Sequence, residues 1–168
     1  MSKTPFVREA VPANAGALIY LRRRNERGRP LVEPPDAVEQ PYLWLGSHPD
    51  IVEHVWDKLS ARLPEGARCI VLGCPALSDP ETGVILALAL GTSYALRVPS
   101  NDHEEALAAG LRSTHTYSAP AKTLDAAETF GQDWLFGSFD GREPDWLRGG
   151  GLRARASQLR RLKSPSAR

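Results

Sequence analysis

Cysteine and long hydrophobic runs are scarce in this sequence, and each shortage excludes a class of protein. The chain has 2 cysteines, Cys69 and Cys74, among 168 residues, which rules out a small domain held together by several disulfides. Their odd separation within one expected strand directs the side chains to opposite faces, so a bridge is disfavoured unless Gly73 forms a bulge. The longest apolar run, residues 84–90, is far shorter than the roughly 20 residues of a membrane-spanning helix, and residues 1–16 lack the apolar centre of a secretory signal. We therefore expect a soluble protein of the reducing cytoplasm, with no membrane partner.

Motifs for covalent catalysis are equally sparse. Residues 91–95, Gly-Thr-Ser-Tyr-Ala, resemble the Gly-x-Ser-x-Gly elbow of hydrolases. Alanine replaces the last glycine, however, and a strand rather than the required helix is expected to follow. Cys74 and His115 could form a nucleophile and base pair, but no nearby residue supplies the third group that would orient them. Both motifs are interpreted as structural.

Metal and cofactor motifs are missing as well. The four histidines, His48, His54, His103 and His115, include no pair four residues apart and no cysteine at zinc-ligand spacing. The acids around His103 lie at an expected helix start, where the helix dipole already explains negative charge. The chain also lacks a phosphate loop and a dinucleotide-binding fingerprint, so neither a metal nor a cofactor is expected.

What the sequence does have is segregated charge. The formal net charge is +1, but residues 31–147 carry 7 basic and 18 acidic residues, a charge of −11. Residues 1–30 carry seven basic residues against two acids, and residues 148–168 carry seven against none. An acidic body with two basic ends indicates binding or self-association rather than a particular fold.

Hydrophobic periodicity in the first half of the chain predicts one long helix. Within residues 48–63 apolar residues recur at spacings of one, three and four, which is typical of an amphipathic helix. Ser47 is the expected N-cap, because its hydroxyl can accept from a free amide of the first turn. The apolar residues of this face are Ile51, Val52, Val55, Trp56, Leu59 and Leu63.

Residues 68–98 show the strongest strand pattern. Residues 68–75 are interpreted as one strand, and residues 79–83, Asp-Pro-Glu-Thr-Gly, are typical of a tight turn. Residues 84–90 are apolar on both faces, which predicts a central strand, and Gly91 and Thr92 then form a turn into a strand over 93–98. The sequence therefore predicts an α+β fold: an antiparallel sheet built on a three-stranded meander (68–98), covered by the helix 48–63 and by shorter helices.

The remaining segments carry weaker patterns. Short strands are expected over residues 17–21, 42–45, 112–118 and 133–139, and short helices over 101–111 and 123–130. Residues 22–30 are expected to form a solvated turn. In domain terms, residues 1–16 are expected to be a loose arm, 17–147 a single domain, and 148–168 a basic tail that is flexible or helical.

The stretch 133–147 is the best candidate for a recognition surface. Aromatic rings give large rigid contact area and carboxylates give orientation, a combination found at protein interfaces. In the alternative interpretation, the rings complete a small core and the acids lie in turns. The candidate partner-binding residues are Trp134, Phe136, Asp140, Glu143, Asp145 and Trp146.

The basic ends are the second candidate site. Clusters of Arg and Lys bind phosphate by releasing counterions, but the acidic body would repel a duplex, and no known nucleic-acid-binding fingerprint accompanies the arginines. The ends could instead fold onto the acidic body of the same or a neighbouring chain, or bind an acidic protein. The candidate contact residues are Arg22, Arg23, Arg24, Arg153, Arg155, Arg160, Arg161 and Lys163.

The leading hypothesis is a small, non-catalytic accessory protein that binds a protein partner through the stretch 133–147 and its charged ends. One alternative is a nucleic-acid-associated protein that uses the basic ends. Another is an unrecognised small hydrolase, centred on Cys74 or on the carboxylates of residues 133–145. A homo-oligomer follows if the basic ends of one copy bind the acidic body of the next.

Overall fold

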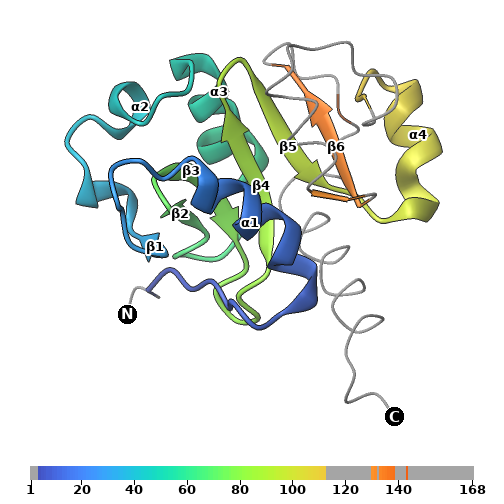
Figure 1. The fold of residues 1–168 in the computed structure, drawn as a ribbon. Coiled ribbons are helices and arrows are strands. Elements are labelled where there is room, and N and C mark those ends of the chain that lie inside the picture. Colours follow the sequence, from blue (N-terminus) through green and yellow to red (C-terminus); the bar gives the residue numbers. More distant parts are fainter. Residues whose placement is uncertain (1–3, 113–129, 132, 139–142, 144–168) are drawn as a thin grey trace.

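An antiparallel sheet organises the molecule. The computed structural model describes residues 4–112, 130–131, 133–138 and 143, and in this part of the chain six strands lie side by side in the order of the sequence (Figure 1). The strands are β1 (Val32–Glu33), β2 (Arg68–Val71), β3 (Cys74–Ser78), β4 (Ile85–Leu90), β5 (Ser93–Arg97) and β6 (Trp134–Gly137). The helices are η1 (Pro12–Asn14), α1 (Ala15–Arg23), η2 (Pro35–Ala37), α2 (Pro41–Trp44), α3 (Pro49–Glu53), η3 (His54–Leu59), η4 (Ser100–Asp102) and α4 (His103–Ala108). The predicted α+β class is confirmed.

The meander contains one strand more than the sequence predicts. Residues 68–75 are not one strand, because Leu72 and Gly73 turn the chain so that Val71 of β2 pairs with Cys74 of β3. The φ angles of Leu72 and Gly73 are 50° and 84°, the two positive values that a two-residue type I′ turn requires. Strands β2 to β5 therefore form a four-stranded meander.

Replacing Gly73 by alanine is expected to lower the free energy of unfolding by about 1 kcal/mol, because a Cβ disfavours the left-handed backbone. Chemical denaturation measures this loss. Gly73→Asn is the control, since asparagine tolerates this region and should cost less. Equal losses for the two variants would contradict the turn geometry.

Different helices cover the two faces of the sheet. On one face, α3 and η3 pack Val52, Val55 and Trp56 into a core that includes Leu77 and Leu96 from the sheet. On the other face, α1 contributes its own set of apolar side chains. Figure 1 shows α1 in front of the sheet and α3 behind it. The residues of the α1 core include Ala17, Leu18, Leu21, Cys69, Ile85, Leu88 and Ala95.

The predicted amphipathic helix is confirmed in its buried face but not in its boundaries. It continues from α3 into the π-helical η3 and ends at Leu59. Its N-cap is His48, whose Nδ1 accepts from the Asp50 amide at 3.1 Å. The expected cap, Ser47, instead donates from its hydroxyl to the Ala89 carbonyl at 3.0 Å and thereby ties the helix start to β4.

The strand β4 is central and buried, as predicted, but its side chains do not alternate strictly. Ser78 pairs with Ile85 while Leu77 pairs with Ala87, so two steps along β4 match one step along β3. This β-bulge turns both Leu86 and Ala87 toward the core under α3.

Two segments expected to be strands are helical. Residues 17–21 belong to α1, where Ala17, Leu18 and Leu21 have the three- and four-residue spacing of a buried helix face. Of residues 42–45, the first three belong to α2 and Leu45 caps its end. The first residue of α2, Pro41, has the preset φ that suits a helix start. Short apolar runs fit both periods, so the sequence pattern could not separate them.

The later elements follow the predictions where they are described. α4 and η4 confirm the helix within residues 101–111, and β6 confirms the strand within residues 133–139. Arg112 forms an isolated bridge with Phe136. The remainder of the expected strand 112–118 and most of the expected helix 123–130 lie outside the described residues.

The segment expected to be a loose arm contacts the folded body at Val7, Arg8 and Asn14. Val7 is buried, and the Arg8 amide donates to the Gly83 carbonyl at 3.0 Å. Asn14 is fully buried: its amide group donates to the carbonyls of Arg8 and Gly83 and its Oδ1 accepts from the Ile85 amide, all within 2.9 Å. These contacts attach the N-terminal segment to the turn before β4.

Candidate binding surface

Two of the six residues predicted for a partner surface lie in the core. Trp134 and Phe136 expose 1% and 0% of their surface. The Arg97 guanidinium lies 4.5 Å from the Trp134 ring centroid. Burial lowers the pKa of Arg97 to about 10, but this value is still well above neutral pH, so the side chain stays cationic. These rings have no area to offer a partner, because strand β6 is covered on both faces. Asp140, Asp145 and Trp146 lie outside the described residues.

A third predicted residue, Glu143, is enclosed rather than exposed. Its Oε1 lies 3.0 Å from His54 Nε2, its Oε2 accepts a short hydrogen bond from the Tyr94 hydroxyl, and the His54 and Tyr94 ring centroids are 4.8 Å apart. Burial raises the pKa of Glu143, but the hydrogen-bonding groups of His54 and Tyr94 stabilise the carboxylate more, so the pKa falls to about 2. We name this group the Glu143 cluster.

The Glu143 cluster has the composition of a catalytic site but not its access. The side chains of His54 and Glu143 expose 1% and 0%, and Tyr94 is fully buried. A general base must reach a substrate proton directly or through one water, which this enclosure prevents. The cluster therefore holds Glu143 against η3 and β5. Sequence reasoning missed it, because its three members are 40 and 49 residues apart along the chain.

The arginines predicted at the first basic segment have different environments. Arg22 forms an exposed ion pair with Glu9 at 2.5 Å. The Arg24 guanidinium lies 5.1 Å from the Tyr20 ring centroid, in cation–π geometry. Arg23 is exposed on α1. The structure thus places these three residues at the end of a helix rather than in a solvated turn. Arg153, Arg155, Arg160, Arg161 and Lys163 lie outside the described residues.

The loop after α1 is closed by its own side chains. Asn25 donates to the Arg29 carbonyl and accepts from the Arg29 amide, at 2.8 and 2.9 Å. Arg29 in turn makes two hydrogen bonds to the Glu33 carboxylate, at 3.0 and 2.6 Å. This bidentate pair holds the loop beside strand β1.

Beside this loop lies a groove made of two adjoining cavities. The first has a volume of about 300 Å³ and the second about 450 Å³, and Arg24, Leu45, Gly46, Leu72 and Gly73 line both. We name the two cavities together the Trp44 groove. Its cationic half is the first cavity, with Arg24, Arg27, Arg29 and Trp44 in its lining. Its apolar half is the second cavity, whose lining includes Tyr20, Leu21, Leu45, Cys74 and Leu90.

Trp44 is the exposed aromatic residue that sequence reasoning missed. It has 60% of its surface exposed, and its neighbour Leu43 has 58% exposed. Both residues belong to the single turn of α2. This turn was missed because residues 42–45 were predicted to form a strand. The signal available in the sequence was Pro41, a residue favoured in the first turn of a helix.

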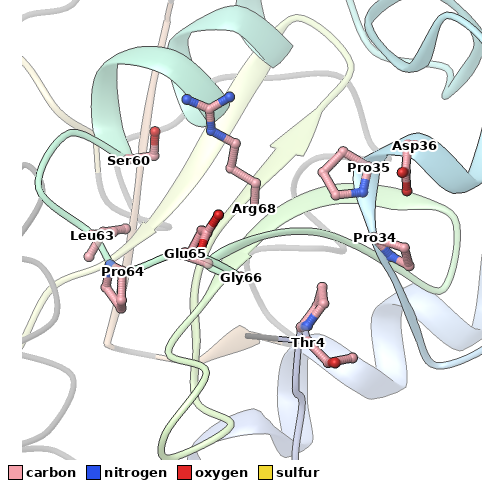
Figure 2. Close-up of a pocket in the computed structure, with 12 residues that line it drawn as sticks. Thr4, Pro34, Pro35, Asp36, Ser60, Leu63, Pro64, Glu65, Gly66 and Arg68 are labelled. Atoms are coloured by element: carbon pink, nitrogen blue, oxygen red, sulfur yellow. The ribbon is translucent and has the colours of Figure 1, made fainter. Parts of the chain in front are cut away.

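A third cavity, of about 720 Å³, lies at the opposite end of β2 and has a different lining. Figure 2 shows Pro34, Pro35 and Asp36 on one side of it and Pro64, Glu65 and Gly66 on the other. Arg68 lies 3.4 Å from Asp57, so its charge already has a partner. The rest of the lining mixes prolines with the polar side chains of Thr4, Asp36 and Glu65, and this combination does not point to one class of ligand.

The surroundings of the described catalytic candidates differ from those that a thiol or serine nucleophile needs. Burial raises the pKa of the Cys74 thiol to about 12, which disfavours the nucleophilic thiolate at neutral pH. Ser93 is buried at the start of β5, where a hydrolase elbow would need a helix. His103 Nε2 lies 2.6 Å from the Val98 carbonyl oxygen. Among the described residues, no group of three potential metal ligands gathers. His115 lies outside them.

Comparison with protein families, with curated proteins and with solved structures finds no match to this chain. Its function must therefore be inferred from its own residues.

Proposed function

We propose that this chain is a non-catalytic protein-binding protein whose partner surface is the Trp44 groove. One observation carries the proposal: Trp44 stands 60% exposed at a cavity whose lining contains three arginines. Tryptophan and arginine are among the residues that most often dominate the free energy of protein association. A role in the reducing cytoplasm is consistent with two free cysteines.

The proposal keeps the function expected from the sequence and changes its surface. The aromatic anchor moves from buried Trp134 and Phe136 to exposed Trp44, and the charge beside it changes from acidic to basic. The raised pKa of Cys74 and the enclosed Glu143 cluster give no support to the hydrolase alternative. Nucleic acid remains the competing ligand for the arginines.

Replacing Trp44 by alanine is expected to weaken partner binding about tenfold or more, since truncating an interface hot spot costs about 2 kcal/mol. The free energy of unfolding should change by less than about 0.5 kcal/mol, because the side chain is exposed. A photo-crosslinking amino acid placed at position 44 in the native host, followed by identification of the crosslinked protein, identifies the partner. Affinity measurements with that protein then test the alanine variant.

The matched control is Leu107, an exposed apolar residue, 39% accessible, on α4. A crosslinker at position 107 should not trap the same protein, and Leu107→Ala should leave the affinity unchanged. Loss of folding in Trp44→Ala, or equal crosslinking from both positions, would overturn the proposal.

A further inference from the structure

We infer that the Trp44 groove binds a short acidic segment of the partner protein, with carboxylates in its cationic half and an adjoining apolar side chain in its apolar half. This inference rests on the proposed function, because it names the chemistry of the partner at the same surface. Its basis is the division of one groove into two chemically different halves.

The cationic half offers two guanidinium groups that no described acid neutralises. Arg29 is engaged by Glu33 through two hydrogen bonds, whereas Arg24 and Arg27 form no ion pair with any residue in the described ranges. Contact with the Tyr20 ring orients Arg24. Guanidinium groups bind carboxylates in bidentate geometry, so this half is suited to one or two acidic side chains beside the Trp44 ring.

The apolar half differs from the cationic half in the charge of its lining. Arg24 is its one cationic lining residue, and the other side chains that define its character are Leu21, Leu45 and Leu90. A leucine-sized side chain placed there would lose apolar contact with water, which is favourable by about 25 cal/mol per Å² of buried area. One extended peptide that crosses the shared residues, Leu72 among them, can therefore use both halves.

Charge favours a peptide over the two competing occupants. A nucleic-acid strand needs cations along the whole of its path, but here they stop at Arg24, and Glu26 lines the cationic half. The described residues as a whole carry 16 acids and 11 bases, which repel a polyanion beyond the groove. The chain's own residues 148–168 carry seven basic residues and no acid, so they cannot supply the carboxylates.

The test is fluorescence anisotropy with the full chain and four labelled probes. The first is a peptide of three Glu followed by two Leu, the second replaces Glu by Gln, the third replaces Leu by Ser, and the fourth is an oligothymidylate. We expect the first peptide to bind about tenfold more tightly than the second or the third, because each lacks one of the two matching features.

Two pairs of variants assign the binding to the two halves. Arg27→Glu reverses a charge in the cationic half, and Thr92→Trp places a bulky ring at the exposed edge of the apolar half. Each should weaken the first peptide about tenfold. Arg62→Glu and Ala61→Trp make the same changes at exposed positions away from the groove and should have no effect. Circular dichroism confirms that the variants are folded, with Arg27→Ala as a milder second charge variant.

Three results would overturn the inference: equal binding of the serine and leucine peptides, insensitivity to Thr92→Trp, or tighter binding of oligothymidylate that Arg27→Glu abolishes. If the peptides do not bind while a crosslinker at position 44 still traps a protein, this inference is wrong and the proposed function stands. If position 44 traps nothing, the proposed function itself fails.

Discussion

Replacing Asn14 by alanine is expected to lower the free energy of unfolding by about 3 kcal/mol. The Asn14 side chain is fully buried and makes three hydrogen bonds, to the carbonyls of Arg8 and Gly83 and from the amide of Ile85. Alanine removes all three hydrogen bonds, at about 1 kcal/mol for each, and takes the side-chain acceptor away from the buried Ile85 amide. Urea denaturation at neutral pH measures the loss.

Asn101→Ala is the matched control, because Asn101 is exposed beside α4 and its truncation should cost less than about 0.5 kcal/mol. A fall in protection from hydrogen exchange at Arg8 and Ile85 should accompany the loss in Asn14→Ala, since both residues depend on this side chain. A loss below about 1 kcal/mol would show that the N-terminal segment does not depend on Asn14 for its attachment.

Acid is expected to destabilise the protein through Glu143. The pKa of this carboxyl is about 2 in the folded chain against an ordinary value of 4.5, so the folded state prefers the ionised form. That preference contributes fully above pH 4.5 and is lost as the pH falls from about 4.5 to about 2. A difference of this size corresponds to about 3 kcal/mol. Glu143→Gln should therefore be less stable than the native chain at neutral pH, and the difference should disappear near pH 2.

Denaturation curves of both proteins between pH 2 and pH 7 provide the measurement, and the difference between them isolates Glu143 from the other carboxyl groups. Glu53→Gln, at an exposed position on α3, is the control and should follow the native chain at every pH. A constant difference between the native chain and Glu143→Gln over the whole range would mean that Glu143 contributes by packing rather than by charge.

The residues expected to determine stability differ from those proposed to bind the partner. Asn14, Arg97 and Glu143 use their polar groups inside the molecule, in hydrogen bonds and an ion pair with other parts of the fold. Trp44, Arg24 and Arg27 line a groove instead, away from both sheet cores. These three side chains can therefore be replaced without loss of the fold, which makes the proposed function testable.

Local patterns predicted the centre of the fold correctly. The buried face of the helix within 48–63 and the apolar strand at 84–90 could be read from spacing alone, because burial imposes a period of 3.6 or 2 over many residues. Short segments were less informative. Residues 17–21 and 42–45 were predicted as strands and are helical, and the turn at Leu72 and Gly73 was missed because leucine is unusual at positive φ.

The candidate site was less predictable than the fold. Sequence reasoning identified Arg22, Arg23 and Arg24 as a candidate basic surface, and Arg24 does line the Trp44 groove. It offered Trp134 and Phe136 as surface residues because composition does not report burial, and these rings lie in the core. It overlooked Trp44, whose exposure depends on a single turn of helix.

The sequence by itself determined the α+β class, the buried central strand and the charge asymmetry, because each follows from the order of residues within one stretch of chain. Only the tertiary structure decided which aromatic ring is exposed, which carboxylate is enclosed and which arginines share a groove. Such pairings join residues from distant elements, as His54, Tyr94 and Glu143 show. They depend on the register of the sheet and on which helix covers each face, and the local spacing of residues predicts neither.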